Sequence, residues 1–148
     1  MIYQLHLQEL VPKDNFYRQL DAAMDLNFLY KATESYYGDE GQESIDPVVF
    51  FKICLVGYLN NINSDRKLIE YCSNCLDVRL FIRYDLDEPL PWHSTISRTR
   101  QLYGEEVFLE LFRKVLSLEQ VRDLSVTPGD AILLLGDSTS GPFSIGGG

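Results

Sequence analysis

The feature that most constrains the fold is an apolar helix that the sequence predicts from Pro47 to about Asn60. Asp46-Pro47 is a strong start signal, because aspartate caps free backbone N–H groups and proline suits the first helical position. The next dozen or so residues are apolar on nearly every side and are interrupted by Lys52. A helix of this kind is usually the central one of a bundle. A bilayer span needs roughly 20 apolar residues, so we expect a buried core helix with no membrane partner.

Helical spacing of apolar residues predicts further helices before and after this one. Pro12 is expected to open the first and Asp25 to cap the second, whereas Ser64 caps the helix that follows the central one. The remaining predicted helices span residues 76–84, 94–103 and 105–118. With 148 residues the chain has room for one core. The predicted fold class is therefore all-α, a compact helical bundle with a helix-turn-helix-like element.

The same spacing predicts which side chains are buried. In the second helix, residues 26–37, the expected inward side chains are Leu26, Leu29, Tyr30 and Thr33. The expected core of the bundle is made by Val49, Ile53, Val56, Leu68, Phe108, Leu111 and Phe112.

The pattern changes after Leu118. Residues 131–135 form a strand candidate, and the following segment is rich in glycine and serine without a core-forming pattern. We therefore divide the chain into a helical domain, residues 1–118, and an irregular tail, residues 119–148. The tail is expected to be unrelated or out of frame, with a remnant of a first catalytic-domain strand as the alternative.

Charge and cysteine content limit the classes of function. The net charge of −9 disfavours a nonspecific nucleic-acid binder, which relies on a basic field. Residues 1–63 carry nine acidic and four basic groups, but residues 64–118 carry nine and eight, so a DNA-facing surface would have to lie in the second segment. Cys72 and Cys75 have the spacing of half a zinc site, but only Cys54 could add a third thiol, and buried reduced thiols are the better interpretation. No signal peptide follows Met1, so a cytoplasmic protein is expected.

The predicted helix over residues 94–103 carries the clearest chemistry. Arginine and glutamine make bidentate contacts to guanine and adenine, and serine contacts phosphates. An ordinary solvent-exposed helix face has the same composition, so the residues alone leave both interpretations open. The candidate DNA-binding residues are Ser94, Ser97, Arg98 and Gln101 on the polar face and Arg100 on its flank.

Four segments together resemble the N-terminal helical domain of bacterial insertion-sequence transposases of the DDE type. They are Ser44-Ile-Asp-Pro-Val-Val-Phe-Phe-Lys52, Asp65-Arg-Lys-Leu-Ile-Glu-Tyr71, Leu80-Phe81 and Pro91-Trp-His-Ser-Thr-Ile-Ser-Arg98. The resemblance covers about residues 10–118 in the family's order and spacing. Trp92 stands where the family usually has an acidic cap, and Thr99 where it often has phenylalanine.

The resemblance implies a role in recognising the terminal inverted repeats of the element and in assembling the transposase. It also implies that catalysis belongs to a following RNase H-like domain, in which three carboxylates hold two Mg²⁺ ions. Asp137, in the context Leu133-Leu-Leu-Gly-Asp-Ser-Thr139, stands roughly where the first carboxylate would fall. One aspartate does not make that site, so we expect a truncated transposase that is no enzyme alone, with no catalytic residue and no cofactor.

A second class of function stays open. A helical protein-interaction module could pair with another copy of the chain or with full-length transposase, and act as an inhibitor, or be a remnant without function. The negative charge and the aromatic-rich helix stripes favour association, whereas the Ser/Arg/Gln helix favours DNA.

Overall fold

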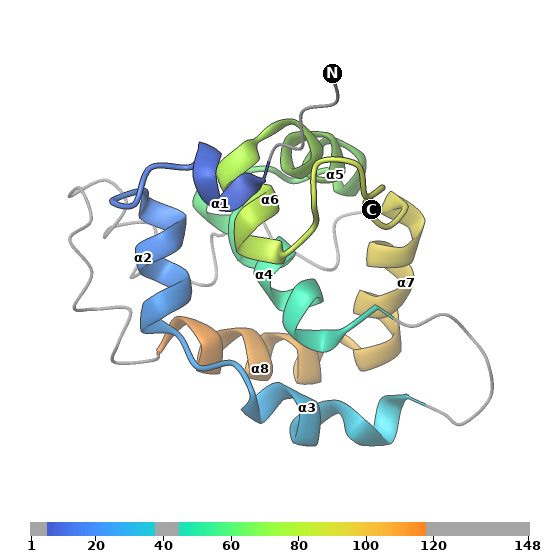
Figure 1. The fold of residues 1–148 in the computed structure, drawn as a ribbon. Coiled ribbons are helices and arrows are strands. Elements are labelled where there is room, and N and C mark those ends of the chain that lie inside the picture. The colour runs from blue at the N-terminus through green and yellow to red at the C-terminus, as the bar shows by residue number, and fades with distance from the viewer. Residues whose placement is uncertain (1–5, 38–44, 118–148) are drawn as a thin grey trace.

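The computed structural model describes residues 6–37 and 45–117, and these residues confirm the all-α fold. Within these two ranges every regular element is a helix (Figure 1). The helices are α1 (Leu7–Leu10), α2 (Phe16–Ala23), α3 (Phe28–Thr33), the 3₁₀ helix η1 (Glu34–Tyr36), α4 (Pro47–Leu59), α5 (Asp65–Asn74), α6 (Leu76–Ile82), α7 (His93–Tyr103) and α8 (Glu105–Leu116).

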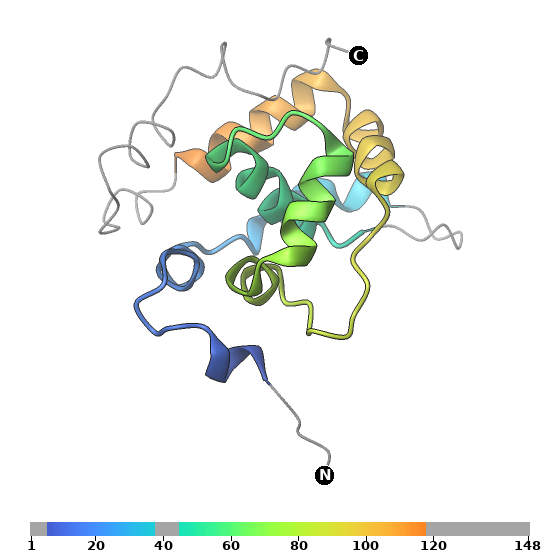
Figure 2. The same cartoon turned by 90° about the horizontal axis from the view of Figure 1, so that it is seen from above.

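The apolar helix α4 lies at the centre of the bundle, as predicted. The Asp46 carboxylate accepts hydrogen bonds from the backbone N–H groups of Val48 and Val49, so the predicted cap is confirmed. Every side chain from Phe50 to Leu59 is buried. Helices α3, α5 and α6 pack against α4, and Figure 2 shows the other helices arranged around it. None of the described helices is long and apolar enough to cross a membrane.

Aromatic rings join α4 to the two last helices. Phe51 stacks on Phe108 with ring centres 5.7 Å apart, and Phe108 stacks on Phe112 at the same separation. Tyr103, at the end of α7, packs against Phe50 and Phe51. This cluster fixes α7 and α8 on the central helix.

The predicted core is confirmed with one exception. Ile53, Val56, Leu68, Phe108, Leu111 and Phe112 are buried. Val49 is only partly buried, because it lies in the first turn of α4 beside the Asp46 cap. The expectation for Tyr30 was wrong as well: the side chain is 46% exposed, and its hydroxyl donates a hydrogen bond to the Asp46 carboxylate.

The first helices differ from the predicted ones. Pro12 does not open a helix: α2 begins later, because the Asn15 side chain accepts the backbone N–H of Tyr17 and caps it. The expected single helix over residues 26–37 is shorter and continues as the 3₁₀ helix η1. The tail after Leu118, with its strand candidate and Asp137, lies outside the described residues.

Candidate nucleic-acid interface

Helix α7 is held by its inner face. Ile96, Thr99 and Tyr103 are buried, and the Tyr103 hydroxyl is hydrogen-bonded to that of Tyr37. Leu102, in contrast, is 49% exposed. It follows Arg98 by four residues, which places it one turn further along the same exposed side of α7.

Three of the predicted site residues form an exposed stripe on the outer face of α7. Ser94, Arg98 and Gln101 are all exposed. They are four and three residues apart, which places them on one side of the helix. Arg98 has no carboxylate partner among the described residues, and its guanidinium donates a hydrogen bond to the Thr95 hydroxyl, 3.3 Å away. Its charge is therefore available to an external ligand.

The other two predicted site residues bind a carboxylate on α5. The Ser97 hydroxyl donates to Asp65 Oδ2 at 2.6 Å, and Arg100 Nη1 lies 3.0 Å and 2.9 Å from the two Asp65 oxygens. The side chains of Arg100 and Asp65 are only 14% and 17% exposed. Ser97 and Arg100 therefore position α7 against α5, and Arg100 does not project from the surface as a phosphate contact would.

The surroundings keep Arg100 charged. Burial alone would lower the pKa of Arg100, but the neighbouring Cys54 and Asp65 raise it above its ordinary value. Its guanidinium also lies over the Phe108 ring, 5.6 Å from the ring centre. Burial raises the pKa of the Cys54 thiol to about 12, so the thiol stays neutral beside the guanidinium.

A buried arginine organises the segment that precedes α7. Arg79, in the last turn of α6, is 8% exposed. Its guanidinium donates to the carbonyl oxygens of Ser73, Asp85 and Glu88 at 2.6–3.0 Å. These contacts order a connection, residues 83–92, that is longer than the 3–4-residue turn of a helix-turn-helix. After this connection α7 packs beside α5, which is not its neighbour in sequence.

Trp92 precedes the first turn of α7. Its side chain makes no capping hydrogen bond and is 78% exposed. An indole at this position leaves the backbone N–H groups of the first turn without the carboxylate that an acidic cap supplies.

The three cysteines do not form a metal site. Cys54 and Cys72 are buried thiols and Cys75 is half-buried. In the two described ranges no group of three or more His, Cys, Asp or Glu side chains is placed to hold a metal ion. The described residues therefore do not form a site in which carboxylates could hold two Mg²⁺ ions. The resemblance assigns that site to another domain.

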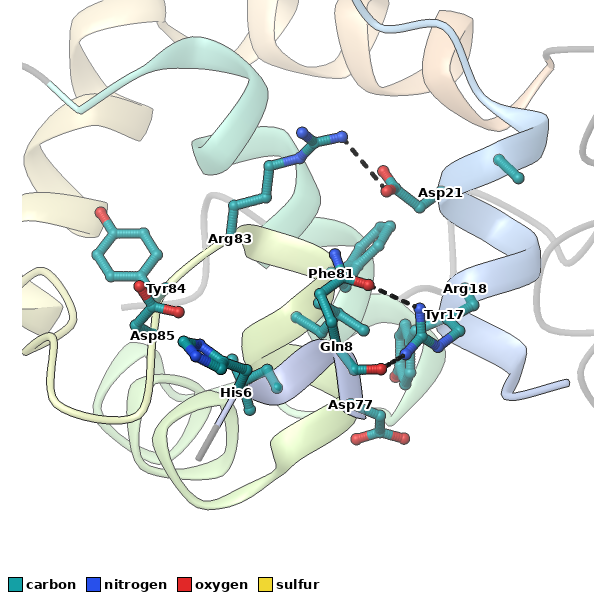
Figure 3. A pocket seen from close by; sticks show the side chains of 13 residues that line it. His6, Gln8, Tyr17, Arg18, Asp21, Asp77, Phe81, Arg83, Tyr84 and Asp85 are labelled. Carbon is teal, nitrogen blue, oxygen red and sulfur yellow. Dashed lines mark hydrogen bonds and ion pairs between the residues drawn. The ribbon is translucent and has the colours of Figure 1, made fainter. Parts of the chain in front are cut away.

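A hollow of about 390 Å³ lies between α1, α2 and α6 (Figure 3). Some of its polar side chains are bonded to one another or to neighbouring residues. Arg18 donates to the side chain of Gln8 and to the backbone of Val11, and Asp21 pairs with Arg83 and with the buried ammonium of Lys52. This hollow lies over helices other than α7, so it is separate from the exposed stripe.

Two positions that organise the site were missed by the sequence analysis. Asp65 stands at the first position of α5, where an acidic residue is explained by the helix dipole alone. Arg79 lies just before the Leu80-Phe81 segment and was not singled out. The role of Asp65 depends on its contact with Arg100, which lies 35 residues further along the chain, and the role of Arg79 depends on carbonyl groups of a loop. Helical periodicity reveals neither contact.

Comparison with known families agrees with this architecture. The family described as "Transposase domain (DUF772)" matches residues 5–102, which is more than half of the chain. The chain therefore belongs to this transposase-domain family, and the resemblance to the N-terminal domain of insertion-sequence transposases is confirmed. No curated protein and no solved structure matches the chain.

Proposed function

We propose that this domain binds DNA through the outer face of α7 and recognises the terminal inverted repeats of an insertion sequence. The observation that carries the proposal is the exposed stripe of Ser94, Arg98 and Gln101 on a helix whose opposite face is held in the core. A rigidly held helix presents its side chains in a fixed register, which is what reading of base edges requires.

Each side chain of the stripe has a distinct role in this proposal. Arg98 and Gln101 contact guanine and adenine edges in the major groove, where such pairs are worth about 1–3 kcal/mol of discrimination each. Ser94, nearer the start of α7, contacts a phosphate. Ser97 and Arg100 act indirectly, because they hold α7 on α5 through Asp65. The family membership supports a transposase-related role for this surface.

The domain is proposed to act without cofactor and to leave strand cleavage to the RNase H-like domain that the resemblance implies. Several carboxylates of the described residues are engaged in caps and ion pairs: Asp46 caps α4, Asp65 pairs with Arg100 and Asp21 pairs with Lys52. These contacts stabilise the bundle.

The test is selection from a pool of random-sequence duplexes at fixed, modest salt. Wild-type protein should enrich a sequence motif, and the Arg98→Ala/Gln101→Ala double variant should lose that enrichment. Arg113→Ala/Lys114→Ala, on the exposed face of α8, is the matched control and should enrich the same motif as wild type. If the α7 variant and wild type enrich the same motif equally, α7 does not read bases.

Two exposed apolar side chains favour a second candidate function. Trp92 is 78% and Leu102 is 49% exposed, and both belong to α7 or its cap. Association with another copy of the chain or with full-length transposase would cover them. In that case sedimentation of the pure protein, or of its mixture with full-length transposase, would show a complex that Trp92→Ala/Leu102→Ala weakens.

A further inference from the structure

The start of α5 carries a second basic surface beside α7. Arg66 and Lys67 are both exposed, and neither has an ion-pair partner among the described residues. The residue before them, Asp65, is hydrogen-bonded to Ser97 and Arg100 of α7. Arg66 and Lys67 are therefore the next residues of a helix that packs against the proposed DNA-reading helix.

The charge balance of this junction differs from that of the whole chain. The net charge of the protein is −9. In contrast, residues 65–67 together with α7 contain one acidic side chain, Asp65, and four cationic ones, Arg66, Lys67, Arg98 and Arg100. Asp65 is neutralised by Arg100, which leaves three exposed cations without a carboxylate partner in the described structure. The next acid on α5, Glu70, follows Arg66 by four residues and so lies on the same side of the helix, but it forms no ion pair with Arg66 or Lys67 in the described structure.

We infer that Arg66 and Lys67 bind the DNA phosphate backbone next to the groove that α7 enters. This inference rests on the proposed function. Most protein–DNA hydrogen bonds go to phosphates and sugars and fix the register of the reading element on the duplex. Phosphate contacts from α5 would do this for α7, because the Asp65 contacts hold the two helices in one relative position.

The inference also assigns Asp65 a double role. A carboxylate at a DNA-facing junction would repel phosphate if it were free. Here its two oxygens accept hydrogen bonds from Ser97 and Arg100 and its side chain is only 17% exposed. The acid thus couples the two helices without presenting its charge to the duplex.

The test is the salt dependence of binding to a random-sequence duplex pool, because phosphate contacts set the slope of log affinity against log salt. The Arg66→Gln/Lys67→Gln variant should lower the magnitude of this slope by about 2, at about 0.9 per lost phosphate contact. Both side chains are exposed, so the fold should be unaffected.

Two further variants sharpen the test. Arg113→Gln/Lys114→Gln removes the same charge from the last turn of α8, whose end lies away from α7 in Figure 1, and should leave the slope unchanged. The exchange Arg66→Lys/Lys67→Arg keeps both charges, so its slope of log affinity against log salt should equal that of wild type. Equal slopes for the α5 and α8 variants would overturn the inference.

The outcomes separate the inference from the proposed function. If wild type binds the pool, the Arg98→Ala/Gln101→Ala variant loses its motif and the α5 variant behaves as wild type, the proposed function stands and the inference fails. If the α5 variant lowers the slope while the α7 variant keeps the motif, phosphate binding by α5 stands and base reading by α7 fails. If wild type does not bind the pool at any salt, both fail.

Discussion

Replacing Asp65 with asparagine tests whether the α5–α7 junction stabilises the fold. The substitution keeps the size of the side chain and one acceptor oxygen but removes the negative charge. Arg100, whose side chain is 14% exposed, then keeps a buried guanidinium without its anionic partner. Removing one member of a buried ion pair costs about 3–5 kcal/mol. Because asparagine still accepts one hydrogen bond and the pair is not fully buried, we expect a loss at the lower end, about 3 kcal/mol.

The control is an exposed acid in a comparable position. Glu105 stands in the first turn of α8, as Asp65 does in α5, but is exposed and makes no ion pair within the described residues. Glu105→Gln measures the helix-dipole contribution alone, which is about 0.3–1 kcal/mol. Urea melts of both variants give the two losses in the free energy of unfolding. The slope of this free energy against urea concentration is compared with that of wild type in each case.

A double-mutant cycle then isolates the pair. Arg100→Met keeps an apolar stem beside Phe108 and removes the charge. If Asp65 and Arg100 interact as described, the double variant Asp65→Asn/Arg100→Met should be more stable than the sum of the single losses predicts, because no charge is left buried. An Asp65→Asn loss no larger than that of Glu105→Gln would refute the reasoning.

Three further predictions concern the core, the thiols and catalysis. Phe112→Ala should cost about 3–5 kcal/mol in urea melts, because Phe112 is buried and stacks on Phe108; a loss under about 1 kcal/mol would contradict the core assignment. The free energy of unfolding should fall as pH rises above about 9, since burial raises the pKa of the Cys54 and Cys72 thiols from 9.0 to about 12 and the unfolded chain loses those protons first. Urea melts across this pH range should show a smaller fall for Cys72→Ala, and no fall in wild type would argue against buried neutral thiols. Finally, the chain alone should not nick duplex DNA with Mg²⁺ in a plasmid-relaxation assay, and nicking that disappears in Asp137→Ala would overturn that expectation.

Much of the fold follows from local sequence signals. Asp46-Pro47 and the apolar run after it predict α4, and Ser64 predicts the start of α5, because caps and periodicity act within one or two turns. The start of α2 was misplaced because Pro12 and Asn15 are both valid start signals, and in the structure it is Asn15 that caps the helix. Tyr30 was misplaced because its ring satisfies the helical spacing while its hydroxyl binds Asp46.

The candidate site was predicted less completely than the fold. Periodicity placed Ser94, Arg98 and Gln101 on the outer face of α7, where the structure has them. It placed Ser97 on the same face and Arg100 on its flank, but it did not show that both bind α5, because that depends on which neighbouring helix they meet. The partner that decides this, Asp65, lies on a helix that is not adjacent in sequence to α7.

The central claim is that the outer face of α7 meets DNA, and site-specific photocrosslinking tests it most directly. A photoreactive amino acid replaces Gln101 on α7 or, as the control, Arg113 on α8; both positions are exposed, so neither substitution disturbs the core. With a labelled duplex carrying the motif selected from the random pool, or the pool itself, illumination should crosslink the protein through position 101 and not through position 113. Equal crosslinking at both positions, or none at position 101 under conditions where the protein binds the duplex, would contradict the claim.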